Sequence, residues 1–539
     1  MLYGITYGYN GKDAPGAELT FGMLGAYAQD EYSITPNLKL TYGLRFDLPL
    51  YFDDLLGNAA IKEQSFNGTN VDVSEWPKSK LLISPRLGFN WDIKGDRSIV
   101  LTGGTGLFTG LLPFVWFTNQ PTNAGQMQNM VEFETSELPA NFAFNPNYKE
   151  TLTQNPDMFP STPGNEVPGA IAYVDPNFKM PQVWRSNVNA EFQLPYGFML
   201  SVGAMCTRDI YNVVQKNMNE KAPSGTYNEQ PGRVYWTKNN YYDNPKTKTV
   251  IQLTNGDEKG YQYSFNAVLT KKFDFGFTGS FGYTYTMAKD MTANPGSSAA
   301  SVWQNNVAVN SLNDPGVSYS LFSTPHRLIA NASYEVAYAN MKTTVSLFYT
   351  GYQQGRFSYT YSNDMNGDGN YSDLMYVPAS KEEMTFVDIK DKQNNVTYSA
   401  VDQQEDFWNY VNNDSYLNDH KGQYVERASS LEPWIHRFDM KIAQDFYAKI
   451  GSRKYGIQVS LDMLNIGNLL NSKWGAYRSC GLQSYDNVRL LKTASKVGEP
   501  LTYQMNASSR EVFQKNSKWD YTASTGSAWQ MQLGVKFTF

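Results

Sequence analysis

One segment of the sequence, residues 364–373, has side chains and spacing that suit metal binding. Gly369 occupies the sixth position of an EF-type calcium loop, where such a loop turns sharply. The twelfth position holds Met375 instead of the usual bidentate Glu, although Asp373 lies nearby and could substitute. The segment therefore predicts either a calcium site or a solvated Asn/Asp/Gly turn, at an extracellular tip. The other candidate ligands are Asp364, Asn366, Asp368, Asn370 and Ser372.

The chain contains few of the histidine and cysteine residues that commonly serve in catalytic sites. Its three histidines are His326, His420 and His436, so a histidine-based triad or zinc site would have to use these. His326 and His436 each precede an arginine at the start of an expected strand, where a rim or interfacial position is the simpler interpretation. Neither a G-x-S-x-G elbow nor an H-E-x-x-H motif occurs. We therefore expect no enzymatic activity and no cofactor beyond the candidate calcium.

Composition narrows the class of protein. Lys plus Arg total 45 and Asp plus Glu total 51, which gives a formal net charge of −6. No basic excess is available to neutralise phosphates, so we expect no nucleic-acid partner. Aromatic residues make up 15% of the chain, which favours strands and places where an apolar ring meets water. The spacing of Cys206 and Cys480 fits no metal or redox motif, and free thiols are expected rather than a disulfide.

The elements that must position these residues are strands, because apolar residues recur at every second position. No run of 18 apolar residues predicts a transmembrane helix. The segment 528–539 alternates strictly between apolar and polar or small residues, as expected for a strand with one apolar face. With residues 1–9, about fourteen antiparallel strands are expected. The others form six pairs, namely residues 20–33 with 38–48, 81–93 with 98–109, 183–194 with 198–213, 261–273 with 275–289, 327–336 with 341–352, and 435–447 with 454–464.

The connections between the expected strands alternate in length. Within each pair the turn is short, whereas the intervening loops are long. Short periplasmic turns and long extracellular loops are typical of outer-membrane barrels, so we predict an all-β, antiparallel transmembrane β-barrel. The loops are rich in Asn, Pro, Gly, Ser and Tyr, which predicts irregular surface structure rather than separate folded domains. The long loops are residues 110–181, 214–260, 290–325, 355–434 and 465–527.

The two faces of the expected strands differ in chemistry. A charged side chain facing lipid costs about 2–4 kcal/mol at the bilayer midplane, so the apolar face is expected to contact lipid and the polar face to line a wet lumen. The polar set could guide a substrate, or only hydrate the pore and contact a plug. The predicted lumen-facing residues are Arg45, Asp47, Arg185, Glu191, Arg327, Glu335, Arg437, Asp439, Lys441 and Lys536.

Aromatic residues of the long loops are candidates for ligand contact, because aromatic faces suit sugars and peptide side chains. The same rings could equally pack the loops on one another. These candidates are Trp116, Phe117, Trp236, Tyr241, Tyr242 and Tyr359.

Several phrases of the sequence, taken in order, resemble a known family. AYAQDEY at residues 26–32 leads into LTYGLRFD at 40–47, which resembles the barrel of TonB-dependent outer-membrane receptors. The resemblance extends in order over nearly the whole chain, to the terminal Phe539. Phrases similar to the Oar-like branch are PHR at 325–327, FYTG at 348–351, NGDG at 366–369, DLMYVP at 373–378, WIHRFD at 434–439 and DMLN at 462–465.

The resemblance implies a barrel of about 22 strands closed around an amino-terminal plug, with a preceding energy-coupling box. Plug, coupling box, leader and about the first eight strands have no counterpart here, so residues 1–539 are expected to be the carboxyl-terminal part of such a barrel. The implied function is TonB-energised uptake or export of an unidentified substrate. The implied partners are outer-membrane lipid and an inner-membrane energy-coupling protein. A passive or structural barrel, a surface-loop enzyme and a soluble multi-sheet binding protein are the alternatives.

Overall fold

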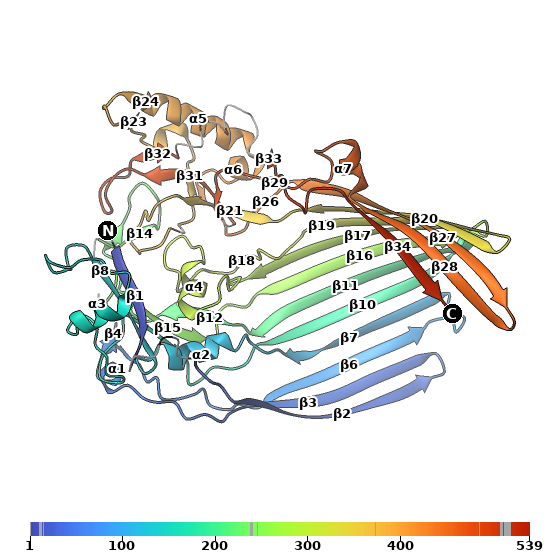
Figure 1. The fold of residues 1–539 in the computed structure, drawn as a ribbon, viewed down its shortest axis with the longest axis horizontal. Coiled ribbons are helices and arrows are strands. Elements are labelled where there is room, and N and C mark those ends of the chain that lie inside the picture. Colours follow the sequence, from blue (N-terminus) through green and yellow to red (C-terminus); the bar gives the residue numbers. More distant parts are fainter. Residues whose placement is uncertain are drawn as a thin grey trace.

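A large antiparallel sheet dominates the computed structural model (Figure 1). The structure describes residues 2–9, 13, 16–237, 241–244, 246–371, 373–484, 486–506, 510, 512 and 519–539. The short turns gather at one end of the sheet, and the long loops gather at the opposite end (Figure 1). No helix in the described part of the chain has both the length and the apolar character needed to cross a bilayer.

The main sheet follows the order of the chain, so each strand lies beside the next one of the set. All six predicted pairs are antiparallel hairpins, which confirms this part of the prediction. The two-residue strand β18 (Ser318–Tyr319) adds to β17 at its loop end. The long strands are β2 (Phe21–Thr35), β3 (Leu38–Tyr51), β6 (Leu82–Asp92), β7 (Ile99–Thr109), β10 (Gln182–Leu194), β11 (Phe198–Tyr211), β16 (Tyr261–Lys272), β17 (Phe277–Asp290), β19 (His326–Tyr338), β20 (Met341–Gln353), β27 (Trp434–Ile450), β28 (Arg453–Leu464) and β34 (Gln530–Thr538).

The hairpin turns depend on residues that can adopt positive φ. Gly276, between β16 and β17, has φ +93°, and a Cβ there would lie 2.1 Å from the carbonyl oxygen of Glu335. Only glycine fits this position, because both the backbone conformation and the neighbouring strand exclude a side chain. Gly197, between β10 and β11, has φ +74°, but no other atom lies close to the position of a Cβ. A glycine is therefore favoured at this position by the backbone conformation of the turn alone. The register of each hairpin is therefore fixed locally.

The sheet is open in the structure. Among the described strands, β2 pairs only with β3 and β34 pairs only with β28, so the two ends do not meet. The prediction that residues 1–9 form a strand of the main sheet is wrong. Instead β1 (Leu2–Gly8) pairs with β8 (Gln128–Glu134) in a separate two-stranded sheet. The alternation of β1 marks a strand correctly but carries no information about its partner, which lies more than a hundred residues away.

The long loops fold into an assembly of helices and small sheets, so the expectation of irregular surface structure is wrong. The largest hydrophobic cluster contains Phe357, Tyr361, Phe407 and Leu491, which come from three separate parts of the chain. Two small sheets, ordered β12-β15-β9 and β26-β21-β31-β30 with β32 beside β31, give the assembly its backbone hydrogen bonds. The apolar residues of this cluster come from separate segments of the loops, and only their meeting in space produces a core.

The helices and short strands of this assembly have the following bounds. The helices are α1 (Ala59–Lys62), α2 (Val115–Thr122), α3 (Tyr148–Gln154), α4 (Ala299–Gln304), α5 (Ala400–Asn413), α6 (Ser415–Asp419) and α7 (Ile466–Leu470). The strands of the two small sheets are β9 (Ala170–Val174), β12 (Val214–Asn217), β15 (Thr249–Thr254), β21 (Arg356–Tyr361), β26 (Ser430–Leu431), β30 (Gln483–Ser484), β31 (Asn487–Thr493) and β32 (Tyr503–Met505). Isolated two-stranded ladders are β4 (Ser65–Phe66) with β5 (Thr69–Asn70), β13 (Gly225–Thr226) with β14 (Val234–Tyr235), β22 (Tyr376–Val377) with β25 (Gln423–Tyr424), β23 (Ile389–Lys390) with β24 (Val396–Tyr398), and β29 (Arg478–Ser479) with β33 (Asp520–Tyr521).

Candidate functional site

One face of the main sheet carries most of the charged side chains of the long strands. Directly paired residues in an antiparallel sheet share a face, so the register can be followed from strand to strand. Arg185, for example, is opposite Gly106 on one side and Thr207 on the other. Followed in this way, one face carries all ten predicted lumen residues, namely Arg45, Asp47, Arg185, Glu191, Arg327, Glu335, Arg437, Asp439, Lys441 and Lys536.

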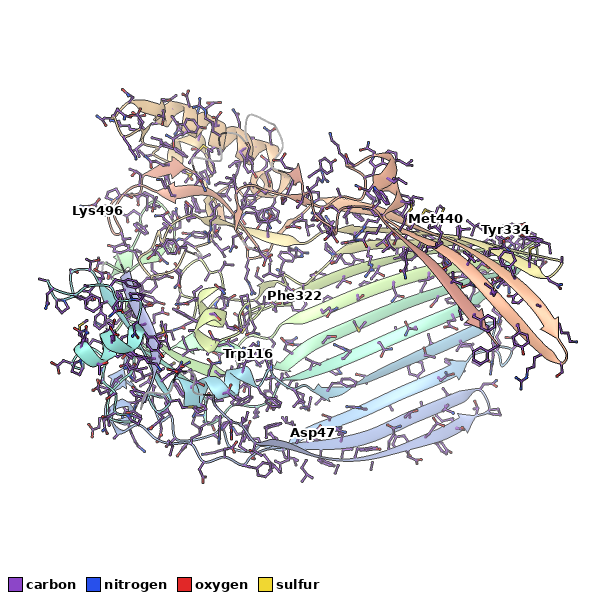
Figure 2. All side chains as sticks on the ribbon, viewed as in Figure 1. Asp47, Trp116, Phe322, Tyr334, Met440 and Lys496 are labelled. Carbon is purple, nitrogen blue, oxygen red and sulfur yellow. The ribbon has the colours of Figure 1, made fainter. Side chains whose placement is uncertain are left out.

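Ion pairs and hydrogen bonds connect charged residues across this polar face. The Arg45 guanidinium lies 2.7 Å from the Asp47 carboxylate, which is buried. Lys441 reaches Asp462 on β28 at 2.7 Å, and Lys342 reaches Glu335 on β19 at 3.0 Å. Figure 2 shows Asp47 where β3 approaches the loop assembly. Pairing of opposite charges stabilises a polar face that neither lipid nor a dry core could hold.

A shallow hollow of about 220 Å³ lies on the polar face near β3, β6, β7 and β10. Its floor includes Gly43, Gly88 and Gly104, which carry no side chains to fill the space. Arg86 and Arg185 also line it. Arg185 donates through Nε to Thr207 Oγ1 at 3.1 Å, and the hollow as a whole offers guanidinium and amide donors to a polar or anionic group.

The opposite face of the same sheet is apolar. It carries Leu533, Val535 and Phe537 of β34, of which Leu533 and Val535 are more than 70% exposed in the isolated chain. Leu44 and Ile442 lie on this face as well, whereas Trp529 precedes the first residue of β34. An exposed apolar face of this extent needs a covering medium.

Two histidines stand on the apolar face towards its loop end, in a row of stacked aromatic rings. The hydroxyl of Tyr283 bonds with Nδ1 of His326 at 2.7 Å, and that of Tyr349 bonds with Nδ1 of His436 at 2.8 Å. The Trp434 ring stacks between the two imidazoles, with centroids 6.2 and 5.8 Å away. The partners of both imidazoles are aromatic side chains, which fits a belt of interfacial residues.

The remaining histidine and the two cysteines are separate from these rows. His420 ends α6 and bonds through Nδ1 with the carbonyl oxygen of Tyr416 at 2.7 Å. Cys206 lies on β11, Cys480 lies in the loop assembly, and no disulfide joins them.

The 364–373 segment lies inside the loop assembly rather than at a solvated tip. Asn366, Asp368 and Asp373 are at most 3% exposed. The Asp364 carboxylate accepts backbone N–H groups of Gly367 at 2.7 Å, Asp368 at 3.1 Å and Gly369 at 2.9 Å. The segment lies on the long-loop side of the sheet, as predicted, but the solvated turn is wrong, because Trp236 packs against the segment and its N donates to the carbonyl of Asn366 at 2.7 Å.

The buried carboxylates of this segment have altered acidity. Burial raises the pKa of Asp364 and Asp368, and it raises the pKa of Asp373 to about 7. The fully buried Arg233 opposes the shift at Asp373, with Nη1 3.4 Å from Oδ1. Asp373 has the guanidinium as its partner, whereas Asp368 lies close enough to Asp364 and Asp373 for their charges to raise its pKa further, and a bound cation would reduce this repulsion.

The sequence-predicted ligands are only partly assembled. Asn370 N donates to Asp368 Oδ1 at 2.8 Å, and Asp373 Oδ2 accepts from Met365 N at 3.1 Å, so backbone groups already occupy some carboxylate oxygens. Within the described part of the chain, no group of three or more His, Cys, Asp or Glu residues is placed to hold a metal ion. Ser372 lies outside the described residues. Calcium binding by this segment stays a prediction.

The loop aromatics proposed for ligand contact lie mainly in hydrophobic clusters. Trp116 and Phe117 of α2 pack in one cluster, Trp236 and Tyr241 in another, and Tyr359 in the largest. All five are buried, whereas Tyr242 is half-buried against the second of these clusters. Their rings pack the loops on one another, which was the alternative that the sequence left open.

Sequence reasoning missed the polar centre of the loop assembly. Gln230 Nε2 donates to the hydroxyls of Tyr361 and Tyr503 at 2.8 Å each, and Arg233 lies over the Tyr424 ring at 4.9 Å. These groups come from four distant parts of the chain, and no local spacing signals their meeting. Arg233 could not have been distinguished from a solvated loop arginine by its sequence context.

A long antiparallel sheet with one polar and one apolar face is the form expected of a barrel wall, and a family match identifies the class of protein. Residues 1–474 match the family described as Outer membrane beta barrel domain. The chain belongs to this family, and the protein resides in the outer membrane. No curated protein sequence matches the chain.

Three similar solved structures are a transporter of the outer membrane, a siderophore receptor and an iron transporter. The outer membrane transporter YddB from Escherichia coli is 11% identical with a TM-score of 0.42, and the match covers 96% of this chain and 45% of that one. The siderophore receptor PirA from Acinetobacter baumannii is 10% identical with a TM-score of 0.35, covering 82% and 41%. The FrpB iron transporter (F3-3 variant) from Neisseria meningitidis is 9% identical with a TM-score of 0.37, covering 84% and 42%. The chain spans less than half the length of each.

Proposed function

We propose that this chain forms much of the barrel wall of a TonB-dependent outer-membrane receptor of the Oar-like branch, and that it moves a substrate without catalysing a reaction. The observation that carries the proposal is the continuous polar face across the long strands, backed by an equally continuous apolar face. A sheet of this kind separates lipid on one side from a wet lumen on the other. The ordered sequence phrases favour the receptor class within the family.

The two edges of the sheet support completion by further strands. In hydrocarbon, the unpaired N–H and C=O groups along β2 and β34 would each cost several kcal/mol. An open sheet is therefore not a stable membrane-spanning state. Because the described part of the main sheet has thirteen long strands, we propose that about nine more close the barrel, which makes a circle of the 22-strand size known for plugged transporters.

The polar face suits contact with a plug or with a passing substrate. Its charged groups are of both signs and several of them form ion pairs, so the wall presents mixed charges rather than a field of one sign. The hollow lined by Arg86 and Arg185 is the place where an acidic group would gain most. The large folded loops would cover the extracellular entrance and make the first contacts with cargo.

Energy coupling distinguishes this proposal from a passive barrel, and two measurements on the full receptor test it. Reconstituted in a planar bilayer, a plugged receptor should show no steady ion conductance, whereas a passive pore conducts. The purified receptor should also bind the carboxyl-terminal domain of the inner-membrane energy-coupling protein. A receptor that conducts ions and does not bind this domain would support the passive barrel instead.

The polar hollow allows a sharper test of the wall-to-plug contact. Arg185→Glu should loosen a plug held by acidic groups and produce conductance, while the lipid-side control Val188→Ala should not. Both residues belong to β10 and lie on opposite faces of the sheet. Conductance from the control alone would contradict the assigned faces.

A further inference from the structure

A groove of about 550 Å³ crosses the apolar face of the sheet. It begins beside the short turn between β16 and β17 and runs obliquely to β20 and β27, where Tyr349 and Phe438 line it. Small residues form part of its lining, because Gly279, Ala330 and Ala332 leave a depression between larger neighbours. The volume lies within the range of about 300–1,000 Å³ that holds small ligands.

Aromatic and aliphatic side chains form the walls of the groove. Phe281 of β17 is 53% exposed, although it lies in the middle of a well-ordered sheet. Phe273 and Phe277 stand 5.7 Å apart across the turn at the short-turn end, where Phe275 joins them. Aromatic clusters at the end of an apolar band mark the interface between bilayer and water.

One cation stands at the short-turn end of the groove. Lys271 Nζ lies 4.6 Å from the centre of the Phe198 ring and 4.4 Å from that of Phe273. It is half-buried by these rings, and no carboxylate pairs with it among the described residues. A lysine is tolerated on the apolar face at this depth, because a lipid-facing cation near the interface between bilayer and water destabilises a barrel by only about 0–1 kcal/mol.

We infer that this groove binds an anionic phospholipid of the periplasmic leaflet, with an acyl chain along Gly279, Ala330 and Ala332 and its phosphate against Lys271. An apolar channel with a single cation at the water interface matches the layout of such a lipid, whose charge lies at one end of its chains. Phe198 and Phe273 would hold the ammonium group at headgroup depth. The inference rests on the lipid-facing orientation of the apolar face proposed above.

Native mass spectrometry of the full receptor, purified from outer membranes and titrated with phosphatidylglycerol or phosphatidylcholine, tests the groove. One phosphatidylglycerol should be retained at detergent levels that strip the rest, with about fivefold preference over phosphatidylcholine. Lys271→Gln should abolish this preference, whereas Lys94→Gln, an exposed lysine at another short turn, should leave it intact.

Variants that fill the groove with a larger side chain provide a second test of lipid binding. Gly279→Leu and, independently, Ala332→Leu should each remove the retained lipid, while Ala204→Leu on the same face outside the groove should not. Heat-modifiable migration on gels reports folding of every variant. Folded filling variants that still retain the lipid, equal retention of both headgroups by the unaltered receptor, or a retained partner protein in place of lipid would overturn the inference. A receptor whose apolar face does not contact lipid after insertion would instead contradict the proposed orientation of the sheet in the membrane.

Discussion

Replacing Val535 by arginine tests the assignment of the two faces of the sheet. Val535 is 71% exposed on the apolar face of β34 and is paired with Val459 of β28. It lies near the middle of the strand, so in the closed barrel its side chain should reach the hydrocarbon region. An arginine there should cost about 2–4 kcal/mol.

That cost is a large fraction of the roughly 5–15 kcal/mol by which an ordinary protein is stable against unfolding. At about 1.4 kcal/mol for each factor of ten, it lowers the folding equilibrium constant roughly 30- to 700-fold. Urea titration of the full receptor in lipid vesicles, followed by tryptophan fluorescence and gel migration, measures the change. Assembly in cells should fall in parallel.

A matched control comes from the same strand. Gln532 lies on the polar face opposite Asp462, so Gln532→Arg should be neutral or slightly stabilising through a new ion pair. The two substitutions introduce the same side chain three residues apart. If Gln532→Arg proved the more damaging of the two, the assignment of lipid and lumen faces would be reversed.

Three further predictions concern the loops and turns. If residues 364–373 bind calcium, millimolar calcium should raise the melting temperature of the full receptor, and Asp368→Ala should remove the rise; an unchanged melting temperature would leave a metal-free buried turn. Because the pKa of Asp373 is raised to about 7 in the folded protein, its contribution is fully present below about pH 4 and is lost as the pH rises towards 7. Hydrogen exchange of the loop assembly should thus speed up from pH 4 to 7 beyond its intrinsic pH dependence, an excess that Asp373→Asn should abolish; an equal excess in that variant would point to another group. Finally, Gly276→Ala should destabilise the β16–β17 hairpin by more than the 1–2 kcal/mol expected for Gly197→Ala, because only at Gly276 does a Cβ also strike the next strand; equal losses in urea titration would contradict this.

The sequence by itself determined the long hairpins and the two faces of their strands. Alternation with a period of two is a local property, and each short turn brings a strand back beside the one just completed. For this reason the alternation alone predicted that the ten polar-face residues from Arg45 to Lys536 share one face of the sheet. A single register error would have exchanged the faces, and the hairpin turns exclude it.

Only the tertiary structure decided the partner of β1 and the interior of the loops. The contact of β1 with β8 and the burial of Asp373 beside Arg233 join residues far apart in the chain. Tyr359 looks the same in sequence whether its ring meets solvent or a hydrophobic cluster. Burial is a property of the whole assembly, since an apolar side chain leaves water only where other segments arrive to cover it.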